Sequence, residues 1–437
     1  MFVGTIDCGV GPQVQTTFDV LVVGGGPAGS TAAGALAQQG YRVAVLEKAR
    51  HPRFHIGESL LPANLPLLER FGVAEQVRAI GMEKWGAEFV SMWDGRRQEF
   101  EFANAWDKSM PYAYQVRRAE FDEILIRRAG ELGAQVVEGC QAREIEFQED
   151  GALIHAEHDD GRRETYHAHM VVDASGRDTL LGNRLQVKQR NKRHNSAALY
   201  AHFSGVERAE GRRSGNIAIY WFEHGWFWVI PLTNGATSVG AVIWPKYLKS
   251  RTVSVREFFL SSIAQCPPLA ERLKDAKLIS EVEATGNYAY SCDRTHGKGY
   301  FLIGDAYAFI DPVFSSGVML AMISGFAAAD AIHACRTEPK RTRTALKKFD
   351  RVMRHGPKQF SWFIYRVTNP IMRELFLGPR NVLRMEEALL SLLAGDIFGR
   401  TPIWRSLWLF KIIYFVMSIA TPRRTLQAQR QRALNIA

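Results

Sequence analysis

The sequence predicts an α/β fold with a Rossmann-like dinucleotide-binding domain and a C-terminal helical region. Two observations carry this prediction. Near the N-terminus a short apolar strand runs directly into a glycine-rich turn and an Ala-rich helix. Beyond about residue 330 the composition changes to basic, amphipathic helices. With 437 residues, of which 46% are hydrophobic, the chain is long enough to bury a large core.

The nucleotide-binding motif begins with a predicted buried strand, residues 19–23, which ends in a glycine-rich turn. Residues 30–39 then favour a helix, and residues 42–46 favour a second strand that ends in an acid. Glycines allow a tight turn, the helix N-terminus meets a pyrophosphate, and the acid accepts ribose hydroxyls. The candidate cofactor-binding residues of this motif are Gly24, Gly26, Pro27, Ala28, Gly29, Glu47 and Lys48.

A second apolar strand, residues 300–303, ends in Gly304 and Asp305. Taken alone it is equally typical of a strand followed by a helix cap. With residues 114–118 and 171–176, however, it resembles the flavoprotein monooxygenase family, which implies FAD. By this resemblance Asp305 contacts the ribityl chain, and Glu58, Arg117, Pro312 and Gly317 are further cofactor-binding candidates.

The resemblance implies an FAD-binding domain of the glutathione reductase and aromatic hydroxylase type, interrupted by a β-sheet substrate domain. Each part has an expected range. They are an N-terminal tail (1–17), a discontinuous FAD-binding domain (18–80, 110–185 and 285–335), a substrate-side β-sheet domain (81–109 and 186–284) and a C-terminal helical region (336–437).

Within that family the chain looks most like a flavin-dependent halogenase. Trp226, Trp228, Ile230 and Pro231 match the motif W-x-W-x-I-P, and residues 309–317 match F-x-x-P-x-x-S-x-G. Two tryptophans one residue apart on a strand point to the same face, so both indoles can form one wall beside the flavin. A pair of core aromatic residues is the simpler interpretation of any W-x-W motif.

Halogenases of this kind use reduced FAD and oxygen to convert halide into hypohalous acid, while the wall keeps the substrate away from the flavin. The resemblance places the halide, chloride or bromide, against the backbone amides of Ser316 and Gly317. It also nominates Lys84, in the segment 81–89, to direct the oxidant, either as an ammonium donor or through a haloamine. The alternative for Lys84 is an ordinary surface lysine. The catalytic candidates are therefore Lys84, Trp226, Trp228 and Ser315.

One residue departs from the pattern of tryptophan halogenases, which carry a glutamate two residues after the proline of the second motif. Here that residue is Phe314. The resemblance then favours halogenases of phenols, pyrroles or carrier-tethered groups over those of free tryptophan, because an electron-rich ring needs less help to lose its proton. Such a pocket also suits an apolar aromatic chain.

In the C-terminal region, residues 344–354 and 371–393 favour basic, amphipathic helices. Residues 404–420 are apolar and aromatic, but 17 residues are short for a membrane span, which needs about 20 apolar residues. Two interpretations stay open: a helix packed on the core, or peripheral contact with a membrane surface.

Charge and cysteine content limit the partners and the cellular compartment that we expect for this protein. Lys and Arg exceed Asp and Glu by ten, which indicates either solvated helix faces or an acidic partner such as an anionic membrane surface or a carrier protein. The five scattered cysteines match neither a disulfide framework nor a metal site, and the histidine pairs lack a third ligand. With no secretory signal and no nucleic-acid-binding motif in view, we expect a cytoplasmic protein, at most peripheral at the inner membrane surface.

The sequence thus predicts a halogenase of an electron-rich aromatic, or of a carrier-tethered aryl or polyene group, in secondary-metabolite or pigment biosynthesis. A single dinucleotide fingerprint is visible, so we expect a separate flavin reductase to supply reduced FAD. Three alternatives stay open: an aromatic hydroxylase or epoxidase on the same scaffold, a flavin reductase of isoprenoid-like chains, and a non-enzymatic member that binds flavin and a carrier protein.

Overall fold

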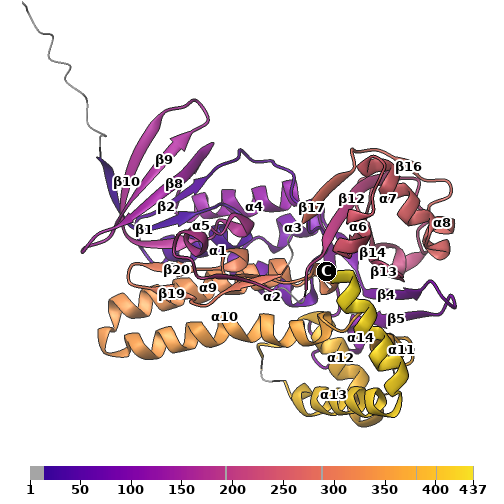
Figure 1. The fold of residues 1–437 in the computed structure, drawn as a ribbon. Coiled ribbons are helices and arrows are strands. Elements are labelled where there is room, and N and C mark those ends of the chain that lie inside the picture. The colour runs from indigo at the N-terminus through magenta and orange to yellow at the C-terminus, as the bar shows by residue number, and fades with distance from the viewer. Residues whose placement is uncertain (1–13, 192–193, 287–288, 380, 400, 437) are drawn as a thin grey trace, which may run out of the picture.

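A computed structural model describes residues 14–191, 194–286, 289–379, 381–399 and 401–436. Two large sheets lie side by side, and the C-terminal helices lie beneath them in the view of Figure 1. This is the α/β class that the sequence predicts.

The first sheet has the strand order β19-β20-β10-β1-β2-β7, and β8 and β9 form an antiparallel extension from β10. Strands β20, β10, β1, β2 and β7 run parallel, so their carboxyl ends meet at one edge. The bounds are β1 (Val14–Val23), β2 (Val43–Glu47), β7 (Gln135–Glu138), β8 (Cys140–Phe147), β9 (Ala152–His158), β10 (Arg163–Asp173), β19 (His296–Gly297) and β20 (Tyr300–Leu302).

Helices cover this sheet and bury its continuous apolar strands. Every residue of β2 is buried, as the all-apolar run before Glu47 predicts. The helices of this part are α1 (Pro27–Gln38), α2 (Leu65–Phe71), α3 (Ala74–Ile80), α4 (Arg118–Glu131), α5 (Leu180–Arg184) and α9 (Gly317–Thr337). The predicted first helix begins three residues earlier than expected, because Pro27 occupies its first turn, where a missing amide costs nothing.

The second sheet has the order β16-β12-β15-β14-β13-β4-β5, with β17 also paired to β12. It is antiparallel except for the parallel pair β13 and β4. The bounds are β4 (Gly86–Ser91), β5 (Arg97–Glu101), β12 (Ala197–Ser204), β13 (Ile217–Phe222), β14 (Gly225–Pro231), β15 (Thr237–Ile243), β16 (Lys277–Leu278) and β17 (Glu283–Gly286).

The two faces of the second sheet are both buried. One packs on the short helices α6 (Pro245–Lys249), α7 (Val255–Ala264) and α8 (Pro267–Arg272). The other packs on the C-terminal helices. Smaller pairings complete the fold: β3 (Met82–Lys84) with β6 (Ala113–Gln115), and β11 (Lys188–Arg190) with β18 (Tyr290–Cys292) and β21 (Ala308–Phe309).

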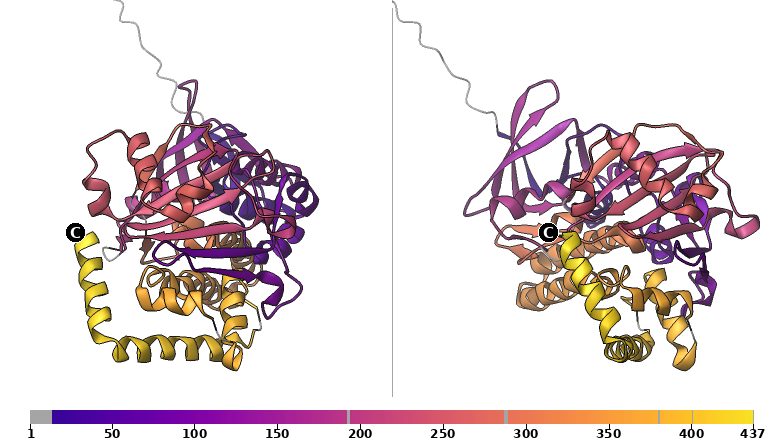
Figure 2. Two further views of the ribbon diagram at one scale, coloured as in Figure 1. Left: turned by 90° about the vertical axis from the view of Figure 1, so that its right-hand side faces the viewer. Right: turned by 45° about the vertical axis from the view of Figure 1, so that its right-hand side comes forward.

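The C-terminal region consists of helices, as expected, although their bounds differ from the prediction. The helices are α10 (Thr342–Ile364), α11 (Pro370–Leu377), α12 (Met385–Ala394), α13 (Ile403–Ala420) and α14 (Pro422–Ile436). The single helix expected over 371–393 is two helices, because the chain leaves helical geometry at Gly378 and takes left-handed backbone angles at Leu383 and Arg384. Figure 2 shows α13 and α14 meeting at a corner at the end of the chain.

Candidate active site

The glycine-rich turn lies where β1 ends and α1 begins. Gly24 has a φ of +101°, and a Cβ atom there would lie 2.4 Å from the carbonyl oxygen of Ala174. A Cβ at Gly29 would lie 1.8 Å from the carbonyl oxygen of Gly24, so both positions need glycine for close packing. At Gly26 a Cβ would meet only the Arg53 side chain, at 3.7 Å, and this face is therefore open to the cavity.

Glu47 ends β2 at the same edge of the sheet. Its buried carboxylate accepts hydrogen bonds from the backbone amides of Gly25 (2.7 Å) and Ala49 (2.9 Å), which hold the turn against the strand end. The neighbouring Lys48 is exposed and donates to Asp178 at 2.5 Å. Both residues line the cavity.

That cavity has a volume of about 650 Å³ and lies between the carboxyl edge of the first sheet and the tryptophan face of the second. Most of the predicted site residues line it. They are Gly24, Gly26, Pro27, Ala28, Glu47, Lys48, Glu58, Trp226, Trp228, Asp305, Pro312, Ser315 and Gly317. Four do not: Gly29 packs behind Gly24, and Arg117, Lys84 and Ser316 are described below.

Arg117 does not line the cavity. It is exposed and pairs with Glu120 one turn along α4. The next residue, Arg118, is buried, lines the cavity and forms a two-pronged ion pair with Asp122, at 2.8 and 2.9 Å. The sequence shows two adjacent arginines, and only the start of α4 decides which of them points inward.

Trp226 and Trp228 lie on one face of β14, with ring centroids 5.9 Å apart, and both form part of the cavity wall. The indole nitrogen of Trp228 donates to the Ser238 hydroxyl at 3.2 Å. Across the sheet, a Cβ at Gly240 would lie 2.1 Å from the Trp228 ring. The ring position thus depends on glycine in β15.

Asp311, which the sequence prediction did not single out, lies behind this wall. It is buried and accepts hydrogen bonds from the Val313 amide and from the side chains of Ser196 and Trp226. Burial still raises its pKa to about 7. Its position directly before Pro312 in the second motif is the signal that could have identified it.

The loop before α9 brings the second motif to the cavity. Ser315 has a left-handed backbone (φ +57°), and this turn directs Gly317 and Val318, the first residues of α9, toward the cavity. Ser316 is buried beside them. The backbone amides at the start of a helix carry no intrahelical partner and attract anions.

Lys84 is buried at the end of β3 and is not a surface lysine. Its Nζ donates to the Ser59 hydroxyl and to the Leu60 carbonyl oxygen, both at 2.9 Å, and lies 5.2 Å from the centroid of the Phe102 ring. Burial lowers the pKa of Lys84 to about 7. Because Ser59 lines the cavity, the amine is one hydrogen bond away from it.

Phe314 points away from the cavity into the core beneath the second sheet. Its ring stacks on Phe376 of α11, with centroids 6.2 Å apart and planes within 4° of parallel. The C-terminal helices therefore cover the position at which tryptophan halogenases carry a glutamate, and they cover it with an aromatic ring.

The polar residues of the cavity fit an FAD molecule. Glu58 bonds through one carboxylate oxygen to His202 at 2.9 Å, while the other oxygen is buried without a partner among the described residues. Asp305 also lines the cavity, and burial raises its pKa to about 6. Unsatisfied acceptors in a roomy cavity suit a ligand that carries hydroxyl and imide donors.

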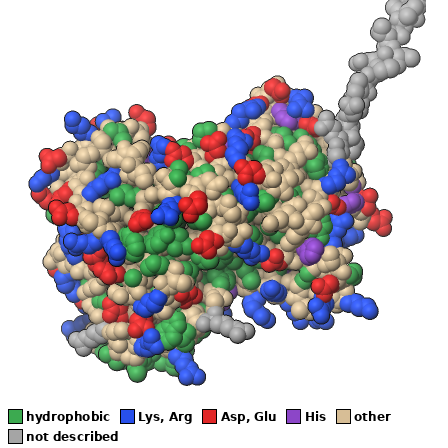
Figure 3. Space-filling model, turned by 180° about the vertical axis from the view of Figure 1, so that it is seen from behind, with side chains coloured by type: hydrophobic (Ala, Val, Ile, Leu, Met, Phe, Trp, Pro, Cys, Tyr) green, Lys and Arg blue, Asp and Glu red, His purple; other side chains and the backbone are tan. Residues whose placement is uncertain are grey.

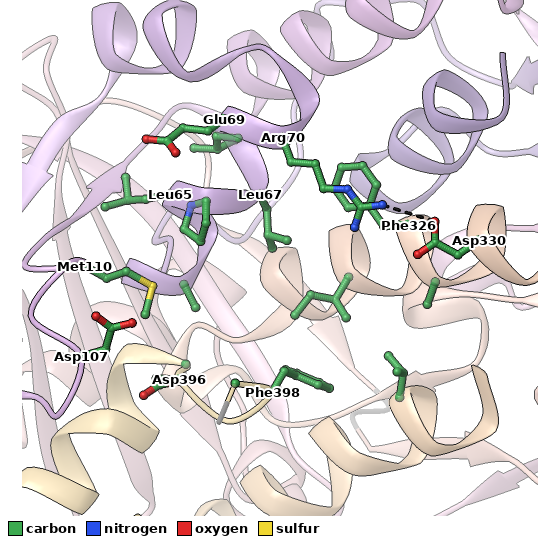
Figure 4. A pocket seen from close by; sticks show the side chains of 18 of the residues that line it. Leu65, Leu67, Glu69, Arg70, Asp107, Met110, Phe326, Asp330, Asp396 and Phe398 are labelled. Carbon is green, nitrogen blue, oxygen red and sulfur yellow. Dashed lines mark hydrogen bonds and ion pairs between the residues drawn. The ribbon is translucent and has the colours of Figure 1, made fainter. Parts of the chain in front are cut away.

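A second, larger hollow of about 1020 Å³ lies between α2, α9, α10 and residues 395–399. Figure 4 shows Leu65 and Leu67 on one side of it and Phe398 on the other, with the Arg70–Asp330 ion pair beside Phe326. No residue of the predicted site lines it. The cofactor residues therefore belong to the smaller cavity.

Comparison with known proteins agrees with this geometry. Residues 17–349 match the model of an FAD-binding domain family. The chain is 32% identical, over 408 residues, to a 1H-pyrrole-2-carbonyl-(peptidyl-carrier protein) chlorinase of Pseudomonas fluorescens, an alignment that covers 87% of this chain and 90% of the relative. The chain belongs to the flavin-dependent halogenases.

Two further halogenases are similar. A tryptophan 2-halogenase of Chondromyces crocatus is 36% identical over 327 residues, which cover 73% of this chain and 62% of that protein. The myxobacterial chondrochloren halogenase CndH, a solved structure, is 31% identical with a TM-score of 0.76, and the match covers 90% of this chain and 93% of that one. This flavin-dependent halogenase is accordingly an oxidoreductase that uses reduced FAD, oxygen and a halide. Membership of this family excludes the hydroxylase, reductase and non-enzymatic alternatives that the sequence left open.

Proposed function

We propose that this halogenase chlorinates or brominates an electron-rich aromatic ring, either a free phenol or pyrrole or a group tethered to a carrier protein. A separate reductase supplies the reduced flavin. Lys84 carries the proposal, because it is a buried amine with a pKa near 7, held one hydrogen bond behind the wall of the FAD cavity.

The cavity at the carboxyl edge of the first sheet is the proposed FAD site. The open face of Gly26 and the first turn of α1 would take the pyrophosphate, and Glu47 the adenosine ribose. Asp305 would accept hydroxyls of the ribityl chain. When FAD is bound in its reduced form, it and oxygen together supply the oxidising power that converts halide into hypohalous acid.

Two features of the chain would direct the oxidising power to the halide and not directly to the substrate. Trp226 and Trp228 fill one wall and exclude a substrate ring from it. The amides of Ser316 and Gly317 at the start of α9 would hold the halide, because the N-terminus of this 21-residue helix favours a negative charge. Ser315 fixes the loop by its left-handed backbone.

Lys84 would then receive hypohalous acid and direct it to one carbon of the substrate. Its hydrogen bonds to Ser59 and Leu60 orient the amine. They leave the third N–H of the ammonium, or the lone pair of the free amine, for the oxidant. A pKa near 7 populates both the ammonium, which can hydrogen-bond the acid, and the free amine, which can be halogenated.

Phe314 supports an electron-rich substrate. The stacked Phe314–Phe376 pair supplies no carboxylate that could accept the ring proton. A phenol or pyrrole loses this proton readily after halogen addition, whereas an indole benzo-ring position needs more help. The carrier-tethered pyrrole named for the Pseudomonas relative is the first substrate class to test.

The test supplies the protein with FAD, a flavin reductase, NADH, oxygen, and chloride or bromide. Candidate substrates are free phenols, free pyrroles and pyrrolyl groups loaded on a carrier protein. We expect product masses that shift by one halogen and only when that halide is present. Lys84→Ala should reduce product formation by about a thousandfold or more, while reduced flavin is still oxidised at the wild-type rate.

Lys298→Ala, which removes an exposed lysine, is the matched control and should leave both rates unchanged. Lys84→Arg tests the chemistry further, because a guanidinium keeps its proton and can only donate. Halide-independent hydroxylation, or normal halogenation by Lys84→Ala, would refute the proposal.

A further inference from the structure

Helix α13 is apolar on opposite faces, but the protein covers only one of them. Ile403, Leu407, Phe410 and Tyr414 are buried against the core, where Phe410 contacts Phe363 and Tyr414 contacts Trp362. On the other side Trp408, Phe415, Val416 and Ile419 are 68, 49, 57 and 78% exposed. Residues spaced in this way share one face of a helix.

This face is apolar enough for a lipid environment. The mean hydropathy of α13 is 1.4, yet only 22% of the helix is buried, compared with 56% for the core helix α9. A helix that is hydrophobic all round is normally buried on all sides, in a protein core or in lipid. On the exposed side of α13 only the Phe415 ring contacts a packed side chain, the edge of Trp362, among the described residues, and Trp408, Val416 and Ile419 remain more than half exposed.

The packing of α13 argues against a helix that spans the bilayer. By length and composition α13 could cross a membrane, since its 18 residues reach about 27 Å. One of its faces, however, is held by the packing of Phe410 on Phe363 and of Tyr414 on Trp362, so lipid cannot surround the helix. A helix anchored on one side can instead lie along the surface of a bilayer, with its free apolar face among the acyl chains.

The charge of the surrounding segment selects the partner. Residues 397–437 contain seven Lys and Arg residues and no Asp or Glu, and so account for seven of the ten net positive charges of the chain. Arg405, Arg423 and Arg430 are exposed and form no ion pair with the described residues. Such a surface attracts anionic lipid headgroups by about 1 kcal/mol for each basic residue.

Helix α14 continues the pattern. Arg423, Leu426, Arg430 and Leu434 lie along one side of it and line a shallow surface hollow. Figure 3 shows hydrophobic side chains at the lower edge of the molecule, the end at which α13 lies, with lysine and arginine beside them. Alternating leucine and arginine on an exposed helix side is typical of contact with the headgroup region.

We propose that α13 and α14 dock this halogenase on an anionic lipid bilayer, with the exposed face of α13 inserted at the level of the headgroups and upper acyl chains. A second copy of the chain fits less well, because symmetric pairing would bring two basic segments, residues 397–437 of each copy, against each other, and neither contains an acid. The proposal is independent of the substrate and of the role of Lys84.

Flotation of the FAD-loaded full-length protein tests it. Vesicles of phosphatidylcholine with phosphatidylglycerol should carry the protein upward at low salt, whereas pure phosphatidylcholine vesicles should carry much less of it. The triple variant Trp408→Ser/Phe415→Ser/Ile419→Ser should bind the anionic vesicles about tenfold more weakly or worse. Arg423→Gln/Arg430→Gln should bind several-fold more weakly and depend less on salt.

The matched control replaces three exposed apolar residues elsewhere, Val253→Ser/Leu260→Ser/Ile279→Ser, and should float like the wild type. The helix variants should keep wild-type FAD binding and halogenase turnover on a water-soluble substrate, which shows that they fold. If the wild type stays in the soluble fraction with anionic vesicles, or if the triple serine variant floats equally well, the proposal is wrong. A wild-type dimer that the triple variant converts to a monomer would assign the face to self-association instead.

Discussion

Lys84 lies in an environment that differs strongly from the ordinary one of a lysine. In water the lysine amine keeps its proton up to about pH 10.5, but at the end of β3 it is surrounded by Phe102, Leu60 and Ser59. Burial penalises the charged form and brings the pKa to about 7. A site that holds an amine in this state stores an unfavourable interaction that a purely structural residue would not need.

This cost predicts a pH-dependent effect of Lys84→Met. Between pH 7 and 10.5 the unfolded chain binds this proton and the folded chain does not, so wild-type stability gains from this group as the pH rises through that window. Below pH 7 the penalty is complete. We therefore expect the free energy of unfolding of Lys84→Met, relative to that of the wild type, to be higher at pH 6 than at pH 10. The difference should change by roughly 1 kcal/mol for each pH unit across the window.

Urea unfolding of both proteins at several pH values measures this difference. Lys298→Met, at an exposed position, should show no such trend. A stability difference between Lys84→Met and the wild type that stays constant from pH 6 to pH 10 would mean that Lys84 keeps an ordinary pKa in the folded protein.

At the scale of elements, the turn between β1 and α1 separates packing from ligand binding. Gly24 and Gly29 have no room for a side chain, so their substitution would disturb the fold. Gly26 has ordinary backbone angles, φ −73° and ψ −174°, and its missing Cβ faces the cavity. The same motif thus contains two structural glycines and one that matters only when a ligand is bound.

Gly26→Ala should therefore weaken FAD binding by about tenfold or more without lowering the stability of the FAD-free protein, because the methyl group occupies the place of a close pyrophosphate contact. Titration of the FAD-free protein by flavin fluorescence, with thermal unfolding in parallel, measures both quantities. Gly130→Ala, on the exposed side of α4, is the control and should bind FAD normally. Wild-type FAD affinity in Gly26→Ala would place the pyrophosphate elsewhere.

For the whole molecule, the C-terminal helices and the second sheet share one core. Phe376 of α11 contacts Phe89, Phe100 and Trp221 of the sheet, with centroids 5.2 to 6.4 Å apart, and stacks on Phe314 of the motif loop. The helices therefore do more than cover the molecule. They fix the loop that leads into α9 and so connect the end of the chain to the site.

Phe376→Ala should remove this connection and destabilise the protein by about 3–5 kcal/mol, the usual cost of a buried phenylalanine. Urea unfolding and limited proteolysis within 365–437 measure the loss. Phe147→Ala, at a partly exposed ring in the first sheet, should cost about 1 kcal/mol or less. Unchanged protease resistance in Phe376→Ala would show that the helices are held by other contacts.

Local motifs were sufficient to predict the parts of this protein whose geometry is set within a few residues. The strand, glycine turn and helix at residues 19–39, the acid at Glu47 and the alternation in W-x-W all follow from chain geometry over short distances, and the structure gathers them at one cavity. The family resemblance then supplied the choice of FAD and of halogenation. The choice between Arg117 and Arg118 was beyond this information, because adjacent residues at a helix start differ only in which side the packed helix presents to the protein.

Other features depend on segments far apart in the sequence. The burial of Lys84 requires Ser59, Leu60 and Phe102 to close around it, and the state of Asp311 requires Ser196 and Trp226. The same packing divides α13 into a covered and an exposed face, although its sequence is apolar throughout. Sequence patterns name the residues and their chemistry, whereas solvent exclusion by distant segments sets their protonation and their exposure.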